Sequence, residues 1–147
     1  TLSFEQSYEE VEGDSASVAE LLAILSAIAE VPVRQDIAVT GSIDQFGNVQ
    51  PVGGVKEKVE GFYKICKALG FTGTQGVIVP SKNLENLVLA DEVLESVEKG
   101  EFHIHLIDTI DDAIELMTET KAEKFHKLVN KRLLEFSRKV NLKKGRA

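Results

Sequence analysis

Hydrophobic residues form their longest nearly continuous run between residues 18 and 29. Because apolar side chains point in every direction around such a segment, it predicts a helix that is buried on most sides, at the centre of the core. Ser17 and Glu20 fit a capping box at the start of this helix, and Pro32 follows its end. Apolar positions at helical spacing predict four more helices, over residues 55–69, 84–97, 111–117 and 121–140.

Short apolar runs and alternating segments predict strands at residues 2–8, 37–43, 49–52, 77–80 and 102–107. A turn at residues 46–48 joins the second of these strands to the third as a hairpin. Since strands and helices alternate through the second half of the chain, we expect an α+β fold (α/β-like) in which helices pack on a mixed sheet. We place one domain at residues 1–118 and a C-terminal basic amphipathic helix extension at residues 119–147.

Composition restricts the class of protein. With 147 residues, of which 43% are hydrophobic and 28% charged, the chain suits a single globular core. No apolar run reaches the roughly 20 residues of a membrane-spanning helix. The single cysteine, Cys66, excludes an internal disulfide and any multi-cysteine metal site, and it favours a reducing compartment such as the cytoplasm. The chain starts at Thr1 rather than Met, which suggests a piece of a longer protein.

Charge is distributed unevenly along the chain. The net charge is −7, but residues 1–119 contain 7 Lys and Arg against 22 Asp and Glu, whereas residues 120–147 contain 10 against 2. An acidic body disfavours binding to a phosphate backbone, so only the basic tail is a candidate arm for weak contact with a nucleic acid or an anionic surface. The competing interpretation of the tail is a terminal helix that docks its apolar stripe on the domain or on a neighbouring subunit.

Several residues of types that often carry chemistry are interpreted as structural. His103 and His105 lie two positions apart on a predicted strand and point to one face, but no convincing further ligand completes a metal site. We interpret these two residues, His126 and the apolar-stripe residue Cys66 as structural, and we predict no metal site. The chain also lacks the phosphate-binding loop and the Gly-x-Ser-x-Gly elbow, so we expect neither ATP binding nor a hydrolase of that fold.

The predicted helix at residues 55–69 carries two lysines in different positions. On a helical wheel, Lys58 falls within the apolar arc and Lys56 falls outside it. The arc consists of Val55, Val59, Phe62, Ile65, Cys66 and Leu69. A lysine on a buried arc snorkels, pairs with a carboxylate, or acts as a neutral base. The wheel alone leaves these alternatives open.

Ser15 is the candidate nucleophile. It lies between a glycine-acid turn and the start of the buried helix, where free N–H groups and the positive end of the helix dipole can stabilise an oxyanion. Gly-Asp-Ser is also a common turn sequence, so this residue by itself does not decide between a structural and a catalytic role.

Three segments together resemble the proteolytic domain of Lon proteases, in the order and spacing of that family. They are EGDSAS at 12–17, PVRQDIAVTGS at 32–42 and PVGGVKEK at 51–58, and the similarity covers most of residues 2–118. The family uses a catalytic Ser–Lys dyad without histidine, and its two residues are 43 positions apart, as are Ser15 and Lys58. The resemblance therefore implies the Lon proteolytic-domain fold and peptide-bond hydrolysis, with Ser15 as nucleophile, Lys58 as general base and Lys56 outside the site.

Further residues receive roles from the same resemblance. Thr40, in the Thr-Gly motif, would orient the Lys58 ammonium through its hydroxyl. Asp14 resembles the B-type branch of the family, and it would form an ion pair with Lys58 in a resting form. The backbone N–H groups of Ser15 and Ala16 are the expected oxyanion donors.

For a longer parent protein, the resemblance implies an ATP-dependent serine endopeptidase of protein quality control, which degrades unfolded or damaged proteins and assembles as a homo-hexamer. ATP and Mg²⁺ would act on an ATPase module that is absent from this sequence, and the chain itself would need no cofactor. Its expected partners are unfolded proteins or peptides. The alternatives are a catalytically silent Lon-like assembly module and a nucleic-acid-binding module; the presence of Ser15, Thr40 and Lys58 argues against a silent module.

Overall fold

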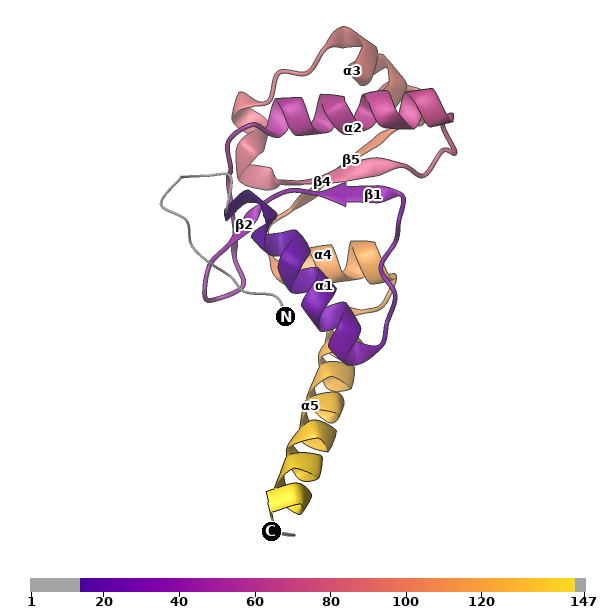
Figure 1. Ribbon diagram of the computed structural model, residues 1–147. Coiled ribbons are helices and arrows are strands. Elements are labelled where there is room, and N and C mark those ends of the chain that lie inside the picture. Colours follow the sequence, from indigo (N-terminus) through magenta and orange to yellow (C-terminus); the bar gives the residue numbers. More distant parts are fainter. Residues whose placement is uncertain (1–13, 145–147) are drawn as a thin grey trace.

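The computed structural model describes residues 14–144, whose helices and strands lie in three layers (Figure 1). The helices are α1 (Ser17–Ala29), α2 (Val55–Leu69), α3 (Asp91–Glu98), α4 (Ile110–Thr118), α5 (Ala122–Lys144) and two 3-10 helices, η2 (Asp14–Ala16) and η3 (Ser81–Asn86). The strands are β1 (Ile37–Val39), β2 (Ser42–Ile43), β3 (Val49–Gln50), β4 (Gly76–Pro80) and β5 (His103–Ile107). The predicted α+β class and the predicted C-terminal helix are confirmed.

The middle layer is a parallel sheet with the strand order β1-β4-β5. Ile37 of β1 pairs with Gly76 of β4, which in turn pairs with His103 of β5. β4 is buried along its whole length, as expected for the central strand of a sheet that is covered on both faces. β2 and β3 form a separate antiparallel hairpin around the predicted turn, so the chain contains both kinds of strand pairing.

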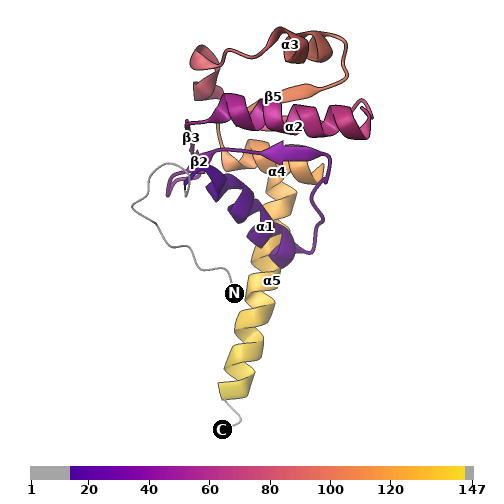
Figure 2. The same ribbon diagram turned by 45° about the horizontal axis from the view of Figure 1, so that its top comes forward.

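The two faces of the sheet support separate cores, because successive residues of β4 point in opposite directions. Val77 and Val79 pack with α2 and α3, whereas Ile78 packs with α1, α4 and the first half of α5 (Figure 2). Although α1 and α2 cover opposite faces, their first turns both lie near the carboxyl end of β1 (Figure 1). This arrangement places the predicted site residues at one edge of the sheet.

The first half of α5 packs on the domain and its second half extends away from it (Figures 1 and 2). Phe125 and Val129 are buried in the core with α1 and α4, whereas no side chain between residues 131 and 143 is buried. Arg132 forms an ion pair with Glu30, at the C-terminal end of α1, at 2.9 Å. The division into a domain at 1–118 and an extension at 119–147 stays a prediction.

The predicted capping box at the start of α1 is wrong. Ser17 is the first residue of the helix, Ala16 occupies the N-cap position, and no side chain caps it. The Ser17 hydroxyl instead accepts a hydrogen bond from the Ile43 N–H at 3.0 Å. The Ser17 hydroxyl oxygen, which the local pattern predicts to cap α1, therefore forms a tertiary hydrogen bond with β2.

The predicted burial of α1 on most sides is also wrong. Val18, Leu22 and Ala29 are buried, but Ala23 and Ala27 are exposed. In an outer layer, only one face of a helix can reach the sheet and its neighbours, whatever the composition of the other face.

Two predicted elements are interrupted. The strand predicted at residues 37–43 divides at Thr40 and Gly41 into β1, in the parallel sheet, and β2, in the hairpin. The helix predicted at residues 84–97 becomes η3, a loop and the shorter α3. The loop is held by a tertiary hydrogen bond, in which the Ala90 N–H donates to the Glu60 carboxylate at 2.8 Å. This contact is made by a residue on α2, so the local apolar pattern does not contain it.

The strand predicted at residues 2–8 lies outside the described residues. Within residues 14–144, no helix has the length and apolarity that crossing a membrane requires.

Candidate active site

Ser15 lies on η2, immediately before α1, and only 5% of the residue is exposed. Its backbone is fixed by Gly41, whose N–H donates to the Ser15 carbonyl at 2.9 Å. The Gly41 carbonyl in turn accepts from the Val18 N–H, in the first turn of α1, at 3.2 Å. These two bonds join the segment that carries Ser15 to the end of β1.

Thr40 lies where the chain leaves the parallel sheet. Its N–H still donates to the Ile78 carbonyl of β4 at 3.0 Å, and its side chain is buried, with 3% of the residue exposed. The next residue, Gly41, has a φ of +145°, a conformation that side chains rarely permit. A Cβ there would lie 3.2 to 3.3 Å from Pro80, Val18 and Val49. The Thr-Gly sequence thus turns the chain and holds the Thr40 hydroxyl beside Ser15.

Lys58 reaches the same point from the other face of the sheet. It lies in the first turn of α2, where its N–H donates to the Gly54 carbonyl at 3.2 Å. Its Nζ donates to Ser15 Oγ at 2.7 Å and to Thr40 Oγ1 at 3.4 Å. The structure therefore brings together Ser15, Thr40 and Lys58, which come from three separate segments of the sequence.

The prediction that Lys58 lies within a buried arc is wrong. The buried face of α2 consists of Val55, Val59, Tyr63 and Cys66. Lys58 lies at one edge of this face together with Ile65 and Leu69, and all three are exposed, the two apolar residues by 56% and 81%. The helical wheel treats every apolar side chain as buried. Within the described residues, however, nothing covers the edge of α2 that carries Lys58, Ile65 and Leu69. Lys56 is exposed as well, so the contact with Ser15, and not burial, distinguishes the two lysines.

Two other predicted roles stay predictions. The side chain of Asp14 lies outside the described part of the structure, and so does its predicted ion pair with Lys58. Ser15 and Ala16 lie at the N-terminal end of α1, where the first N–H groups of a helix have no helical acceptor. Their position is compatible with the predicted oxyanion site.

Asn83, for which no role was predicted from the sequence, supports the segment before α2. Its Oδ1 accepts from the Val52 N–H at 3.0 Å, and its Nδ2 donates to the Val52 carbonyl at 2.8 Å. Val52 precedes the two glycines that lead into α2. Because Lys58 lies in the first turn of α2, the position of Val52 affects the position of Lys58. The available signal was the position of Asn83 shortly after β4, because polar residues beyond the carboxyl ends of parallel strands commonly line sites.

The histidines lie away from Ser15. His103 and His105 stack with their ring centroids 6.0 Å apart, and His103 Nε2 lies 2.7 Å from the Gly73 carbonyl oxygen. His103 lies at the amino end of β5 and His105 at its middle, whereas Ser15 is hydrogen-bonded to Gly41, beyond the carboxyl end of β1. His126 Nε2 lies 2.7 Å from Asp111 Oδ1. Within residues 14–144, no group of three or more His, Cys, Asp or Glu side chains is arranged to hold a metal ion.

The pKa values of three side chains away from Ser15, those of His105, Asp36 and Cys66, are shifted by their surroundings. Burial lowers the pKa of the His105 imidazole, and the nearby His103 ring and Arg34 guanidinium act in the same direction. Arg34 donates to the Asp36 carboxylate at 2.8 Å, which lowers the pKa of Asp36. Burial raises the pKa of the Cys66 thiol, so this cysteine is a poor nucleophile at neutral pH.

The chain is similar in sequence to known proteolytic domains. A sequence profile of the Lon protease (S16) C-terminal proteolytic domain matches residues 10–119. The chain is 56% identical over 117 residues to the putative Lon protease homolog of Escherichia coli (strain K12), an alignment that covers 80% of this chain and 20% of that protein. It is 36% identical over 121 residues to the archaeal Lon protease of Thermococcus kodakarensis, covering 82% of this chain and 17% of that protein.

The chain thus spans about a fifth of the length of these relatives. The profile matches most of the chain, including the segments that carry Ser15, Thr40 and Lys58. The predicted resemblance is confirmed, and the chain belongs to the family of Lon protease C-terminal proteolytic domains.

Proposed function

We propose that this domain is a serine endopeptidase in which Ser15 and Lys58 form the catalytic dyad. The observation that carries the proposal is the 2.7 Å contact between Lys58 Nζ and Ser15 Oγ, two residues 43 positions apart. A nucleophile and its base need this hydrogen-bond distance for direct proton transfer. Membership in a family of proteolytic domains supports peptide bonds as the substrate.

The reaction follows from the roles of the two side chains. Ser15 Oγ attacks the scissile carbonyl carbon and forms a new C–O bond, while its proton passes to neutral Lys58 Nζ. The tetrahedral intermediate then expels the amine by breaking the C–N bond, and Lys58 returns the proton to that amine. Water, activated by the same lysine, hydrolyses the acyl-enzyme and regenerates the Ser15 hydroxyl.

Proton transfer requires an uncharged Lys58, and in the described residues this side chain is exposed to water. A peptide lying across Ser15 would exclude water from Nζ. In the same proposal, Thr40 Oγ1 holds Nζ in line with Ser15, and the N–H groups of Ser15 and Ala16 bind the oxyanion. Asp14 would hold charged Lys58 in a resting form.

The remaining proposals concern a longer protein. This sequence contains no phosphate-binding loop, so the ATP and Mg²⁺ of an ATP-dependent protease would bind elsewhere in such a protein. We propose a homo-hexamer, unfolded or damaged proteins as substrates, and the cytoplasm as the compartment. The single free cysteine, Cys66, is compatible with a reducing compartment.

The test is cleavage of casein by the wild-type chain and by three single variants, Ser15→Ala, Lys58→Ala and Lys56→Ala. Lys56→Ala is the matched control, since it removes an exposed lysine from the same turn of α2. We expect the wild type and Lys56→Ala to cleave and the other two to be inactive. An active Lys58→Ala would exclude Lys58 as the base.

A second readout covers the case in which none of the four proteins cleaves casein. A fluorophosphonate probe labels an activated serine without the need for an unfolded substrate. Labelling of Ser15 that is lost in Lys58→Ala but kept in Lys56→Ala would support the dyad. If Ser15 is not labelled, the catalytically silent assembly module becomes the better description.

A further inference from the structure

The second half of α5 carries an apolar stripe along the part of the helix that leaves the domain. We call residues 131–144 the distal segment. In the first half of α5 the stripe, with Phe125 and Val129, is buried in the domain core. In the distal segment it continues through Leu133, Phe136 and Val140, which are 47%, 45% and 51% exposed. Roughly 20 Å of helix thus presents an apolar surface outside the domain.

The distal segment is also strongly basic. It contains six Lys and Arg residues and one acidic residue, Glu135. Of the basic residues, Arg132 pairs with Glu30 and Glu135 and covers the Phe136 ring at 5.1 Å. Lys139 and Lys143 flank the apolar stripe on the helical wheel and are exposed. A partner for this surface must therefore combine negative charge with exposed apolar side chains.

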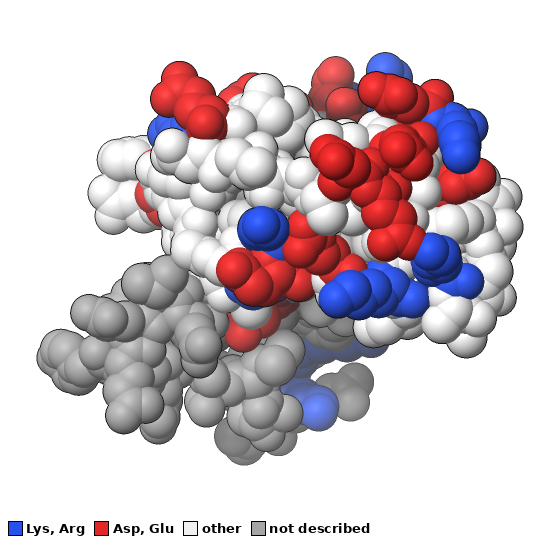
Figure 3. All heavy atoms as spheres, turned by 90° about the horizontal axis from the view of Figure 1, so that it is seen from above, with Lys and Arg blue, Asp and Glu red and all other residues white. Residues whose placement is uncertain are grey.

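The chain itself contains such a surface at η3 and α3. We call residues 81–99 the α3 face. It contains five Asp and Glu residues against two lysines, and all five acidic residues are exposed. Figure 3 shows acidic side chains gathered on the side of the molecule where α2 and α3 lie. In the same segment Leu84, Val88 and Leu94 are 53%, 72% and 44% exposed, which supplies the apolar component.

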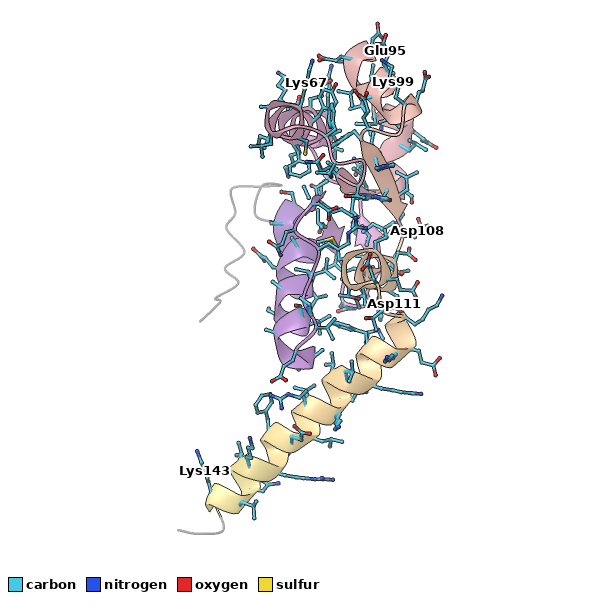
Figure 4. The ribbon with its side chains drawn as sticks, turned by 90° about the vertical axis from the view of Figure 1, so that its right-hand side faces the viewer. Lys67, Glu95, Lys99, Asp108, Asp111 and Lys143 are labelled. Carbon is cyan, nitrogen blue, oxygen red and sulfur yellow. The ribbon has the colours of Figure 1, made fainter. Side chains whose placement is uncertain are left out.

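These two surfaces lie at opposite ends of the molecule. Figure 4 shows Glu95 at the end formed by α3 and Lys143 at the far end of α5, and Figures 1 and 2 show the same separation. The distal segment cannot reach the α3 face of its own chain. We propose that it docks on the α3 face of a second copy, in a head-to-tail contact.

The distribution of charge favours a second copy over a nucleic acid or an anionic membrane. Residues 1–119 carry a net charge of −15, and this acidic body repels a polyanion that approaches the basic helix. A phosphate backbone also offers nothing to the exposed stripe at Leu133, Phe136 and Val140. The α3 face matches both the charge and the apolar side chains.

Sedimentation velocity of the full chain tests this contact. The Ser15→Ala background is used throughout, so the result does not depend on whether the proposed protease activity is correct. We expect concentration-dependent association in about 0.1 M salt. Because the Debye length shortens from roughly 10 Å to roughly 3 Å between about 0.1 M and 1 M salt, association should weaken by at least about tenfold over this range.

Exchanging the charges identifies the two surfaces. One variant carries Lys139→Glu and Lys143→Glu in the distal segment, and another carries Glu95→Lys and Glu98→Lys on the α3 face. Each variant alone should sediment as a monomer, since its facing charges then repel. An equimolar mixture should associate again, because the acidic tail of one variant meets the basic face of the other. Circular dichroism of each variant checks that α5 stays helical.

The matched control makes the same change of net charge at the start of α5, through Lys121→Glu, just before the helix, and Lys124→Glu, in its first turn. This control should associate like the parent chain. Equal weakening by the control, or failure of the mixture to associate, would show that no specific contact exists. A parent chain that stays monomeric, or that is monomeric and binds a short DNA duplex or anionic vesicles through the distal segment, would also overturn the proposal.

Discussion

The Gly41 N–H donates to the Ser15 carbonyl at 2.9 Å, so the residue after Thr40 fixes the backbone of the proposed nucleophile. The same glycine accepts from Val18 at the start of α1. Ser15 and Thr40 are therefore held at a fixed separation by one pair of backbone hydrogen bonds. Lys58 then has to reach a single point to contact both hydroxyls, which its position in the first turn of α2 allows.

Gly41→Ala should damage both stability and activity. A methyl group at Gly41 would enter a conformation with φ of +145° and meet Pro80, Val18 and Val49 at 3.2 to 3.3 Å. We expect a loss of about 1–3 kcal/mol in the free energy of unfolding, measured with urea, and loss of peptide cleavage. The control is Gly61→Ala on α2, where a Cβ meets nothing within 4 Å. That change should stabilise the protein by roughly 0.5–1 kcal/mol.

Thr40→Val should separate catalysis from folding. Valine keeps the shape of the buried side chain but removes the hydroxyl that lies 3.4 Å from Lys58 Nζ. We expect kcat for a peptide substrate to fall by roughly ten- to a hundredfold, as when a positioned polar group is removed from an active site, with little change in KM. Thr40→Ser keeps the hydroxyl and should retain most of the activity. Wild-type kcat in Thr40→Val together with a loss in Thr40→Ser would show that packing of the methyl group, and not the hydroxyl, is what the site requires.

The sequence predicted the elements whose signals are local. Helix α2 ends at Gly70 as predicted, and β4 lies where a short apolar run follows a glycine-rich turn. The chain leaves the parallel sheet at Gly41 and forms η3 around Asn83 because of contacts with residues that are distant in sequence. No pattern within a short window contains that information.

The site shows the same division. Spacing and family resemblance selected Ser15, Thr40 and Lys58, and the structure brings these three residues together. The helical wheel also pointed to Lys58, but its reason was incorrect, because the wheel predicted a buried side chain and the side chain is exposed. Asn83 was missed because its role consists of two hydrogen bonds to the backbone of Val52, 31 positions away.

Asn83 should act as a positioning residue for Lys58. Asn83→Ala removes both hydrogen bonds to Val52 and frees the segment from which α2 begins. At about 1 kcal/mol for each bond, we expect a loss of roughly 2 kcal/mol in the free energy of unfolding. Because Nζ then has to find Ser15 Oγ from a looser helix start, kcat should fall more than KM changes. The control is Asn86→Ala, an exposed asparagine in the same 3-10 helix.

Asn83→Asp tests the two bonds separately. An aspartate still accepts from the Val52 N–H but cannot donate to the Val52 carbonyl when it is ionised. Its activity and stability should lie between those of the wild type and Asn83→Ala. Wild-type kcat in Asn83→Ala would show that the position of Lys58 does not depend on this contact.

Acid should destabilise the domain partly through His105. Burial lowers the pKa of this imidazole from its ordinary value of 6.5, with further contributions from His103 and Arg34, while Asp36 opposes them. The folded state therefore binds a proton less readily than the unfolded chain. The contribution to stability is full above pH 6.5 and is lost as the pH falls through the lowered pKa. His105→Gln removes the titrating group, so its Tm should fall less than that of the wild type between about pH 8 and pH 5. Each protein is compared with itself across pH, which removes any constant effect of the substitution on packing. Parallel curves for the two proteins would show that His105 does not contribute to the acid sensitivity of the fold.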